Sequence, residues 1–206
     1  VIFRSAASNP KPGDWKGIAI TGNASSEIRN ANIRDAVAGI AVENSTLSLQ
    51  STNVTNSLSR GLFARNSKVT VTDGAFENNK GAAIHADSYT ELSVKQVKFS
   101  GNQVALYSSP MSITDVESSL MEGNDYGILD MGNSFLAFSN SQISKNKTGA
   151  SADDVLDKSI IGSVSGNETD FNRDFKTAAS LLPPNPEIPG VESRPLNTND
   201  KIGDWL

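Results

Sequence analysis

A repeat of 22 residues constrains the fold of this chain more than any other feature. Pairs of a small residue and an aliphatic residue recur at five successive steps of 22 residues: Gly17-Ile18, Gly39-Ile40, Gly61-Leu62, Ala83-Ile84, Ala105-Leu106 and Gly127-Ile128. A second series keeps nearly the same period, with steps of 23, 23, 22 and 22 residues: Asn56, Asn79, Asn102, Asn124 and Asn146. Such self-similarity is typical of a solenoid, in which each repeat packs on the next.

The apolar residues within each repeat alternate as they do in strands. Alternation with a period of two is seen in Leu47/Leu49, Val69/Val71, Leu92/Val94 and Met111/Ile113, followed by Phe135 and Phe138. Each repeat therefore holds about three short strands, and the absence of a 3.6-residue period excludes leucine-rich, ankyrin and tetratricopeptide repeats. We predict an all-β fold, a right-handed parallel β-helix of about six coils with about 22 residues per coil. Its core column comprises Ile18, Ile40, Leu62, Ile84, Leu106 and Ile128.

Residues at equal positions in successive coils should form columns about 4.8 Å apart. We expect the small residues from Gly17 to Gly127 to form a column at a turn. The asparagines should form a ladder, because Asn tolerates the left-handed conformation and its amide can bond to the Asn of the next coil. An apolar residue stands three positions before most of these asparagines, namely Phe76, Phe99, Met121 and Ile143.

Short motifs within this frame resemble a known family. Residues 13–146 resemble the right-handed parallel β-helix, or pectin-lyase-like, family, and the opening Pro12-Gly13-Asp14-Trp15-Lys16-Gly17-Ile18 is similar to that of bacterial secreted or surface members. Phe76-Glu77-Asn78-Asn79 with Gly81-Ala82-Ala83-Ile84, and Phe99-Ser100-Gly101-Asn102, resemble the FxxN and GGAI motifs of polymorphic outer-membrane adhesins. The resemblance implies an extracellular or cell-surface location and a role in adhesion.

The sequence divides into four parts. We expect an N-terminal strand and loop at 1–14, the β-helix at 15–168, a capping segment at 169–182 and an extended proline-rich tail at 183–206. Five prolines remove the backbone donors that a parallel ladder needs, so the tail cannot continue the stack. Its apolar end suggests binding to a protein partner or a second copy of the chain, through the anchors Ile202, Trp205 and Leu206.

Composition excludes several function classes. The net charge of −5 argues against binding nucleic acid, which needs a basic surface. No apolar stretch approaches the length of a membrane span. Cysteine is absent, which excludes disulfides and cysteine-based metal centres, and we expect no metal site and no cofactor.

An enzyme of the pectin-lyase-like group would need paired carboxylates, or a base beside a cation. The catalytic candidates are Asp115, Asp130 and His85. Other outward charges that could assist are Asp73, Asp87, Asp125, Arg65 and Lys95. No two of these aspartates form a local motif, and His85, the single histidine, is expected to be solvated on a strand's outer face.

The competing hypothesis is a non-catalytic structural or binding module, and we favour it. Short polar side chains are expected on a flat outer face suited to protein or glycan contacts: Ser48, Thr70, Thr72, Ser93, Lys95 and Thr114. Aromatic rows that would mark a sugar groove are missing, because Tyr89, Tyr107 and Tyr126 are expected at turns and do not keep the repeat. The carbohydrate-active enzyme remains the alternative.

Overall fold

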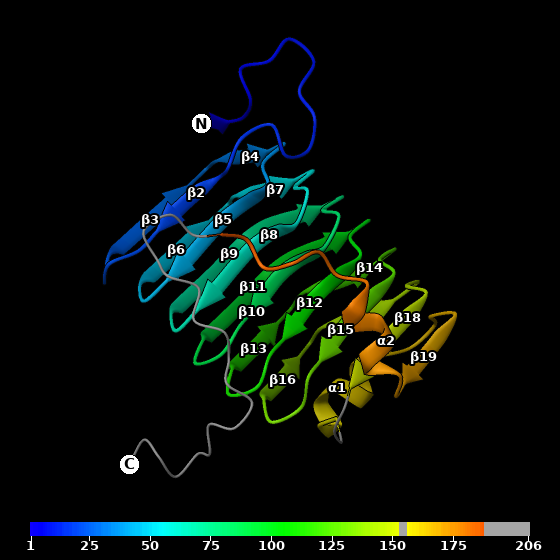
Figure 1. The fold of residues 1–206 in the computed structure, drawn as a ribbon. Helices are drawn as coiled ribbons and strands as arrows, with labels where there is room; N and C mark the ends of the chain where they lie inside the picture. The colour runs from blue at the N-terminus through cyan, green and yellow to red at the C-terminus, as the bar shows by residue number, and fades with distance from the viewer. Residues whose placement is uncertain (153–155, 188–206) are drawn as a thin grey trace.

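The computed structural model describes residues 1–152 and 156–187, and it shows a parallel β-solenoid (Figure 1). One sheet has eight strands, in the spatial order β19-β18-β15-β12-β10-β8-β5-β2. These strands are β2 (Ile18–Ile20), β5 (Ala38–Glu43), β8 (Arg60–Arg65), β10 (Ala82–Ala86), β12 (Val104–Ser108), β15 (Tyr126–Asp130), β18 (Thr148–Ala152) and β19 (Thr169–Asn172). The all-β parallel fold is confirmed, with about seven turns of about 22 residues.

A second sheet of eleven strands forms the other two sides of each coil. Its strands are β1 (Ile2–Phe3), β3 (Ser25–Arg29), β4 (Asn32–Arg34), β6 (Thr46–Gln50), β7 (Asn53–Thr55), β9 (Lys68–Glu77), β11 (Glu91–Ser100), β13 (Ile113–Glu117), β14 (Leu120–Glu122), β16 (Phe135–Ser139) and β17 (Gln142–Ser144). The long strands β9 and β11 span both sides, pairing with β6 and β13 along one half and with β7 and β14 along the other.

The 22-residue period is the strand register itself. Leu62 pairs with Ile84, Ile84 with Leu106 and Leu106 with Ile128, and all four side chains have no solvent exposure. The apolar residues three positions before the asparagines are buried in the same core. There the rings of Phe76 and Phe99 stack, with their centroids 5.7 Å apart. Stacked aliphatic and aromatic columns thus fill the interior of the solenoid.

Each coil turns at residues in the left-handed conformation, which short polar side chains and glycine tolerate best. Three such series run along the solenoid with steps of 21 to 23 residues. The first is Asp35, Asn56, Asn78, Gly101, Gly123, Lys145 and Gly166; the second is Asn44, Asn66, Tyr89, Met111 and Asn133; the third is Asn30, Ser51, Asp73, Gln96, Ser118 and Asn140. Three turns per coil explain why the sequence is so rich in Asn, Ser and Gly.

The predicted asparagine ladder is present and buried. Asn79 Nδ2 donates to Asn102 Oδ1 over 2.9 Å, and the same bond repeats from Asn102 to Asn124, Asn124 to Asn146 and Asn146 to Asn167. Two details of the prediction are wrong. Asn56 lies outside the ladder, where the Ser57 N–H donates to Asn79 Oδ1, and the left-handed residue is the one before each ladder asparagine.

Two columns differ from the prediction. From Gly39 to Gly127 the small residues lie inside strands of the eight-stranded sheet, and a Cβ on Gly61 would come within 2.5 Å of the Ala83 carbonyl oxygen. Glycine is required there mainly because the next coil approaches closely, and not because the chain turns. Ile113 is 47 % exposed, whereas Thr114, expected outside, has no exposure and pairs with the buried Leu92. A shift of one residue exchanges the two faces of a strand.

Both ends of the described solenoid are covered in part. At the start, Trp15 packs against the core and its Nε1 donates to the Arg34 carbonyl oxygen. At the other end, helix α1 (Lys158–Ser163) places Ile160 in the core beside β16. In the expected capping segment at 169–182, Phe171 and Leu181 are 45 % and 59 % exposed. No helix in the described ranges is long and apolar enough to cross a membrane.

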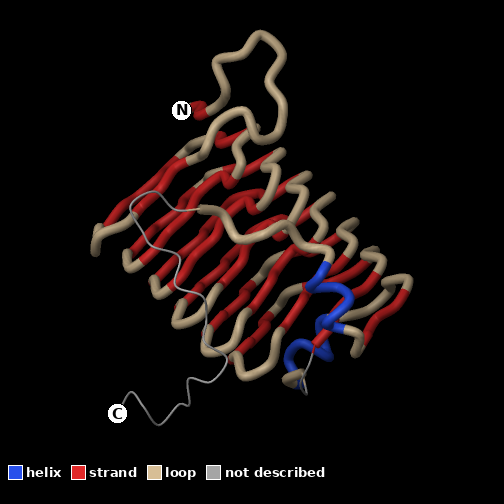
Figure 2. Tube along the Cα trace, in the orientation of Figure 1, coloured by secondary structure: helices blue, strands red, loops and turns tan. Residues whose placement is uncertain are grey.

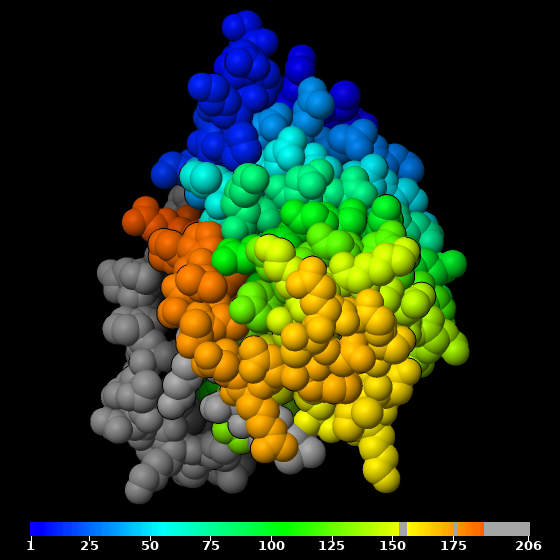
Figure 3. All heavy atoms as spheres, turned by 90° about the vertical axis from the view of Figure 1, so that its right-hand side faces the viewer, coloured from blue at the N-terminus to red at the C-terminus, as the bar shows by residue number. Residues whose placement is uncertain are grey.

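Helix α2 (Phe175–Ser180) and the residues after it cross the outer face of the eight-stranded sheet (Figures 1 and 2). Ala178, Ala179 and Leu182 pack against side chains of that face. Residues 183–187, the first part of the expected tail, form no strand. In the space-filling view this orange segment lies directly against the coils (Figure 3). The candidate site lies on this covered outer face of the eight-stranded sheet.

Candidate functional site

The outer face of the eight-stranded sheet carries a column of large side chains that is shielded from solvent. Phe63, His85, Tyr107 and Leu129 pair in register on β8, β10, β12 and β15. They are between 0 and 8 % exposed, although they point away from the solenoid core. The outward orientation predicted for His85 agrees with the structure, but its predicted solvation is wrong, since His85 is 2 % exposed.

The rings of this column contact one another. His85 stacks on Tyr107 with centroids 4.1 Å apart and meets Phe63 edge-on at 5.2 Å. The guanidinium carbon of Arg65 lies 5.2 Å from the centre of the Phe63 ring. Tyr107 was expected at a turn, but it lies within β12. Ring contacts of this kind stabilise the packing of the face.

Charged residues of three coils form a row beside the rings. Arg65 Nε donates to Asp87 Oδ2 over 2.8 Å, and its Nη1 lies 3.9 Å from Glu43 Oε1. Burial raises the pKa of Glu43 despite Arg65. Burial would also raise the pKa of Asp87, but His85, the Arg65 guanidinium and the Ser88 N–H outweigh it, so that pKa lies below its usual range.

Arg60 is buried as deeply as Asp87, at 2 % exposure. Its Nε donates to His85 Nδ1 over 3.4 Å and its Nη2 to the Pro183 carbonyl oxygen over 2.9 Å, while its Nη1 has no hydrogen-bond partner. Burial lowers the pKa of Arg60 to about 10, so the guanidinium remains charged at neutral pH. Burial also raises the pKa of Tyr107 to about 12.

The hydrogen bonds of His85 determine what chemistry it can perform. Because Nδ1 accepts from Arg60, the ring proton lies on Nε2, which donates to Ser109 Oγ over 2.9 Å. Burial and the charge of Arg60 lower the pKa of His85 to about 3. A general base must take a proton from its nucleophile and carry a positive charge. This imidazole already donates to Ser109 and has a cation on its other side, so it is unsuited to that role.

The lowered pKa of His85 makes the free energy of unfolding depend on pH. Unfolded His85 binds a proton below about pH 6.5, whereas the folded state stays neutral to about pH 3. The free energy of unfolding therefore falls as the pH drops through this window, by about 1.4 kcal/mol per pH unit. Urea unfolding at pH 7 and pH 5 should show a loss of about 2 kcal/mol in the wild type.

His85→Gln is the matched variant, since it keeps a neutral polar side chain and removes the only histidine. We expect most of the loss between pH 7 and pH 5 to disappear. Glu43, whose raised pKa acts in the opposite sense, is present in both proteins, so their difference isolates His85. An equal loss in both proteins would contradict the assigned burial and neutrality of His85.

The aspartates predicted as catalytic candidates do not come together. Asp115 is exposed on β13 of the eleven-stranded sheet, between Ser93 and Ala137 of the neighbouring coils. Asp130 ends β15 of the other sheet, where its Oδ1 accepts from the Gly132 N–H and Ser134 Oγ. Across residues 1–152 and 156–187, no three His, Cys, Asp or Glu side chains are grouped to hold a metal ion. The tail anchors Ile202, Trp205 and Leu206 lie outside the described residues.

Sequence reasoning named Arg65 and Asp87 only as separate outward charges, and it missed Arg60, Glu43 and the row itself, although a signal was present. Glu43, Arg65 and Asp87 stand 22 residues apart, as do Phe63, His85 and Tyr107. The period that identified the core columns also marks these outer columns. The period could not show that residues far along the chain cover these outer columns.

A match to a family model supports the fold. Residues 16–169 match the family model described as a right-handed β-helix region. Among solved structures, two trypsin-treated forms of QnrB1, a plasmid-mediated fluoroquinolone resistance protein, are similar to this chain. One is 12 % identical, with 82 % of this chain and 96 % of that chain covered and a TM-score of 0.24; the other is 11 % identical, with 81 % and 94 % covered and a TM-score of 0.25. A search of curated proteins finds no match. The chain belongs to the right-handed β-helix family.

Proposed function

We propose that this protein is a non-catalytic structural and binding module of a secreted or surface protein. In this role the solenoid is a rigid scaffold, and the exposed face of the eleven-stranded sheet contacts protein or glycan. Parallel strands at a spacing of about 4.8 Å give that face a regular array of short polar and charged side chains. Thr70, Ser93 and Lys95 point outward from it, as predicted.

The observation that carries this proposal is the distribution of the carboxylates on that face. Four of the glutamates lie beside a lysine of a neighbouring coil: Glu91 by Lys68, Glu117 by Lys95, and Glu77 and Glu122 on either side of Lys98. Glu27 pairs with Arg29 of its own strand, and Asp115 stands singly between Ser93 and Ala137. Glycosidic cleavage needs two carboxylates facing one sugar, or a base beside a bound cation. Single carboxylates neutralised by lysines serve solubility and complementary contact better than acid–base chemistry.

Incubation with acidic and neutral polysaccharides, with and without Ca²⁺, tests the proposal. We expect no reducing-end or unsaturated products under any condition, whether or not a polysaccharide is bound. The matched variants are Asp115→Asn and Asp130→Asn. Turnover by the wild type that falls in either variant would overturn the proposal in favour of a carbohydrate-active enzyme.

A further inference from the structure

Residues 181–187, here called the strap, run across the strands of the eight-stranded sheet and are held through their backbone. Gln103 Nε2 donates to the Leu181 carbonyl oxygen over 3.0 Å, Arg60 Nη2 to that of Pro183 and Ser59 Oγ to that of Pro184 over 3.2 Å. Every donor is a side chain of the solenoid, and every acceptor is a main-chain carbonyl of the strap. This pattern recognises an extended chain and places no demand on its side chains.

Two of the three donors, Ser59 and Gln103, lie at the same position of coils that are two steps apart, and Gly81 holds that position in the coil between them. Ser59, Gly81 and Gln103 are 22 residues apart, each just before a strand of the eight-stranded sheet. Two coil spacings cover about 10 Å, and three residues of a polyproline-type chain cover about 9 Å. Two carbonyls of such a chain that are three residues apart, as in Leu181 and Pro184, can therefore meet donors two coils apart.

The middle coil provides a surface for a proline ring. A Cβ on Gly81 would lie 3.1 Å from Pro183 Cδ and 2.6 Å from Arg60 Nη1. Glycine at this position thus lets both groups approach the backbone. Pro183, Pro184 and Pro186 also lack an N–H, so a chain of this kind leaves no backbone donor unpaired at those positions.

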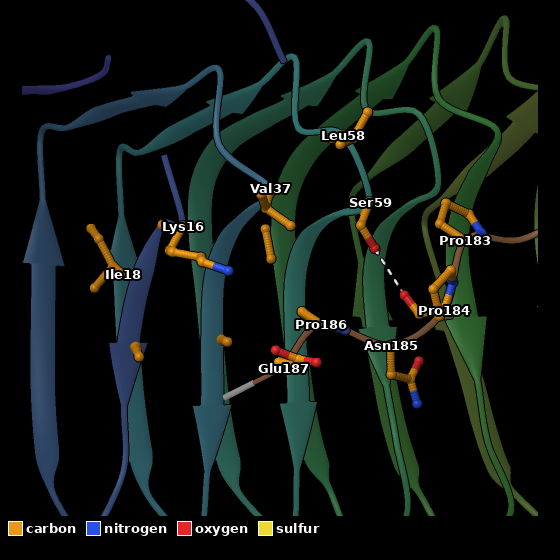
Figure 4. Close-up of a pocket in the computed structure, with 14 residues that line it drawn as sticks. Lys16, Ile18, Val37, Leu58, Ser59, Pro183, Pro184, Asn185, Pro186 and Glu187 are labelled. Atoms are coloured by element: carbon orange, nitrogen blue, oxygen red, sulfur yellow. Dashed lines mark hydrogen bonds between the residues drawn. The ribbon is translucent and has the colours of Figure 1, made fainter. Parts of the chain in front are cut away.

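The strap fills this groove incompletely. Arg60 Nη1 is buried without a hydrogen-bond partner. Beside the strap lies a cavity of about 270 Å³ with mostly apolar walls, formed by Ile18, Val37 and Leu58 on the solenoid side and by Pro184 and Pro186 on the other (Figure 4). A buried donor without a partner and an unfilled apolar space both oppose tight packing.

We propose that this groove is a binding site for an extended, proline-rich segment of a partner protein, and that the strap occupies it when the partner is absent. The fitting ligand has prolines over Gly81, carbonyls facing Ser59 and Gln103, an acceptor for Arg60 Nη1, and a bulky apolar side chain for the cavity. Recognition of preformed polyproline-type chains by apolar grooves is a general mode of peptide binding. The groove lies on the opposite sheet from the face assigned above, so either proposal can fail alone.

Fluorescence anisotropy with a labelled peptide of the sequence 179–190 tests the site in the full chain. The strap competes at an effective concentration of the order of millimolar. Loosening it with Pro183→Gly, Pro184→Gly and Pro186→Gly together should therefore increase peptide affinity at least tenfold. Adding Ser59→Ala and Gln103→Ala should reverse this gain, whereas adding Gln142→Ala, an exposed glutamine of the other sheet, should not.

Hydrogen–deuterium exchange on the wild type provides a measurement that needs no variant. A saturating amount of the same peptide should increase exchange in 177–182 as the strap leaves. Failure of the loosened chain to bind the peptide, or equal binding without the Ser59 and Gln103 side chains, would overturn the site. If the chain self-associates and the free peptide reverses this association, the groove binds the strap of a second copy. That result would overturn the assignment to a partner protein.

Discussion

Leu62→Asp is expected to abolish folding of the solenoid. Leu62 has no solvent exposure and stacks between Ile40 and Ile84 in the core. Removing such a side chain costs about 2–5 kcal/mol. An unpaired carboxylate in its place adds a desolvation cost of several kcal/mol, and the sum is comparable with the whole stability of a domain, about 5–15 kcal/mol. Circular dichroism and size-exclusion chromatography should show an unfolded or aggregated chain.

Ile113→Asp is the matched control. Ile113 is also an aliphatic residue of a parallel strand, but it is 47 % exposed on the outer face of β13. We expect this variant to fold, with a change in the free energy of unfolding of less than about 1 kcal/mol. Since the alternation of the sequence alone placed Ile113 inside, the pair of variants also tests the strand register. Equal behaviour of the two variants would contradict the register described here.

Asn102→Ala should lower the free energy of unfolding by about 4 kcal/mol. Asn102 Oδ1 accepts from both the backbone N–H and Nδ2 of Asn79, and its Nδ2 donates to the Phe76 carbonyl oxygen and to Asn124 Oδ1. The site is 2 % exposed, so water cannot replace these bonds. Each buried group left without a partner costs about 1–3 kcal/mol. Chemical denaturation followed by circular dichroism measures the loss.

Asn53→Ala removes an asparagine that also bonds to the neighbouring coil, but at the surface. Asn53 Nδ2 donates to Asn32 Oδ1 over 3.0 Å in an exposed position. We expect this variant to lose less than about 1 kcal/mol, because solvent can satisfy the freed groups. A loss for Asn102→Ala no greater than that for Asn53→Ala would show that the buried ladder does not stabilise the fold.

The sequence was sufficient for the fold because the period of the repeat equals the register of the strands. Leu62, Ile84 and Leu106 could be aligned by counting, and the structure pairs them as counted. The prediction was wrong where one polar residue breaks an apolar column. Thr114 occupies an inward position, and the apolar Ile113 beside it shifted the expected alternation by one residue.

The candidate site was less predictable, for a different physical reason. Columns of outward side chains follow from the same period, but their burial depends on a segment about 80 to 120 residues later in the chain, as the bond from Gln103 to Leu181 and that from Arg60 to Pro183 show. No local pattern around His85 encodes that cover. Strand alternation therefore predicted its direction correctly and its exposure wrongly.

The asparagine ladder gives the solenoid a polarity. Every rung points its amide donor toward the C-terminal end, so the side-chain dipoles add along the axis as peptide dipoles do in a helix. The last donor, Asn167 Nδ2, meets the carboxylate of Asp170 at 2.9 Å, and this bond lowers the pKa of Asp170. A negative group thus terminates the positive end of the row. Whole coils bearing Asn could be inserted anywhere between Asn79 and Asn167 without disturbing this terminus, so the length of the rod is modular while its direction is fixed.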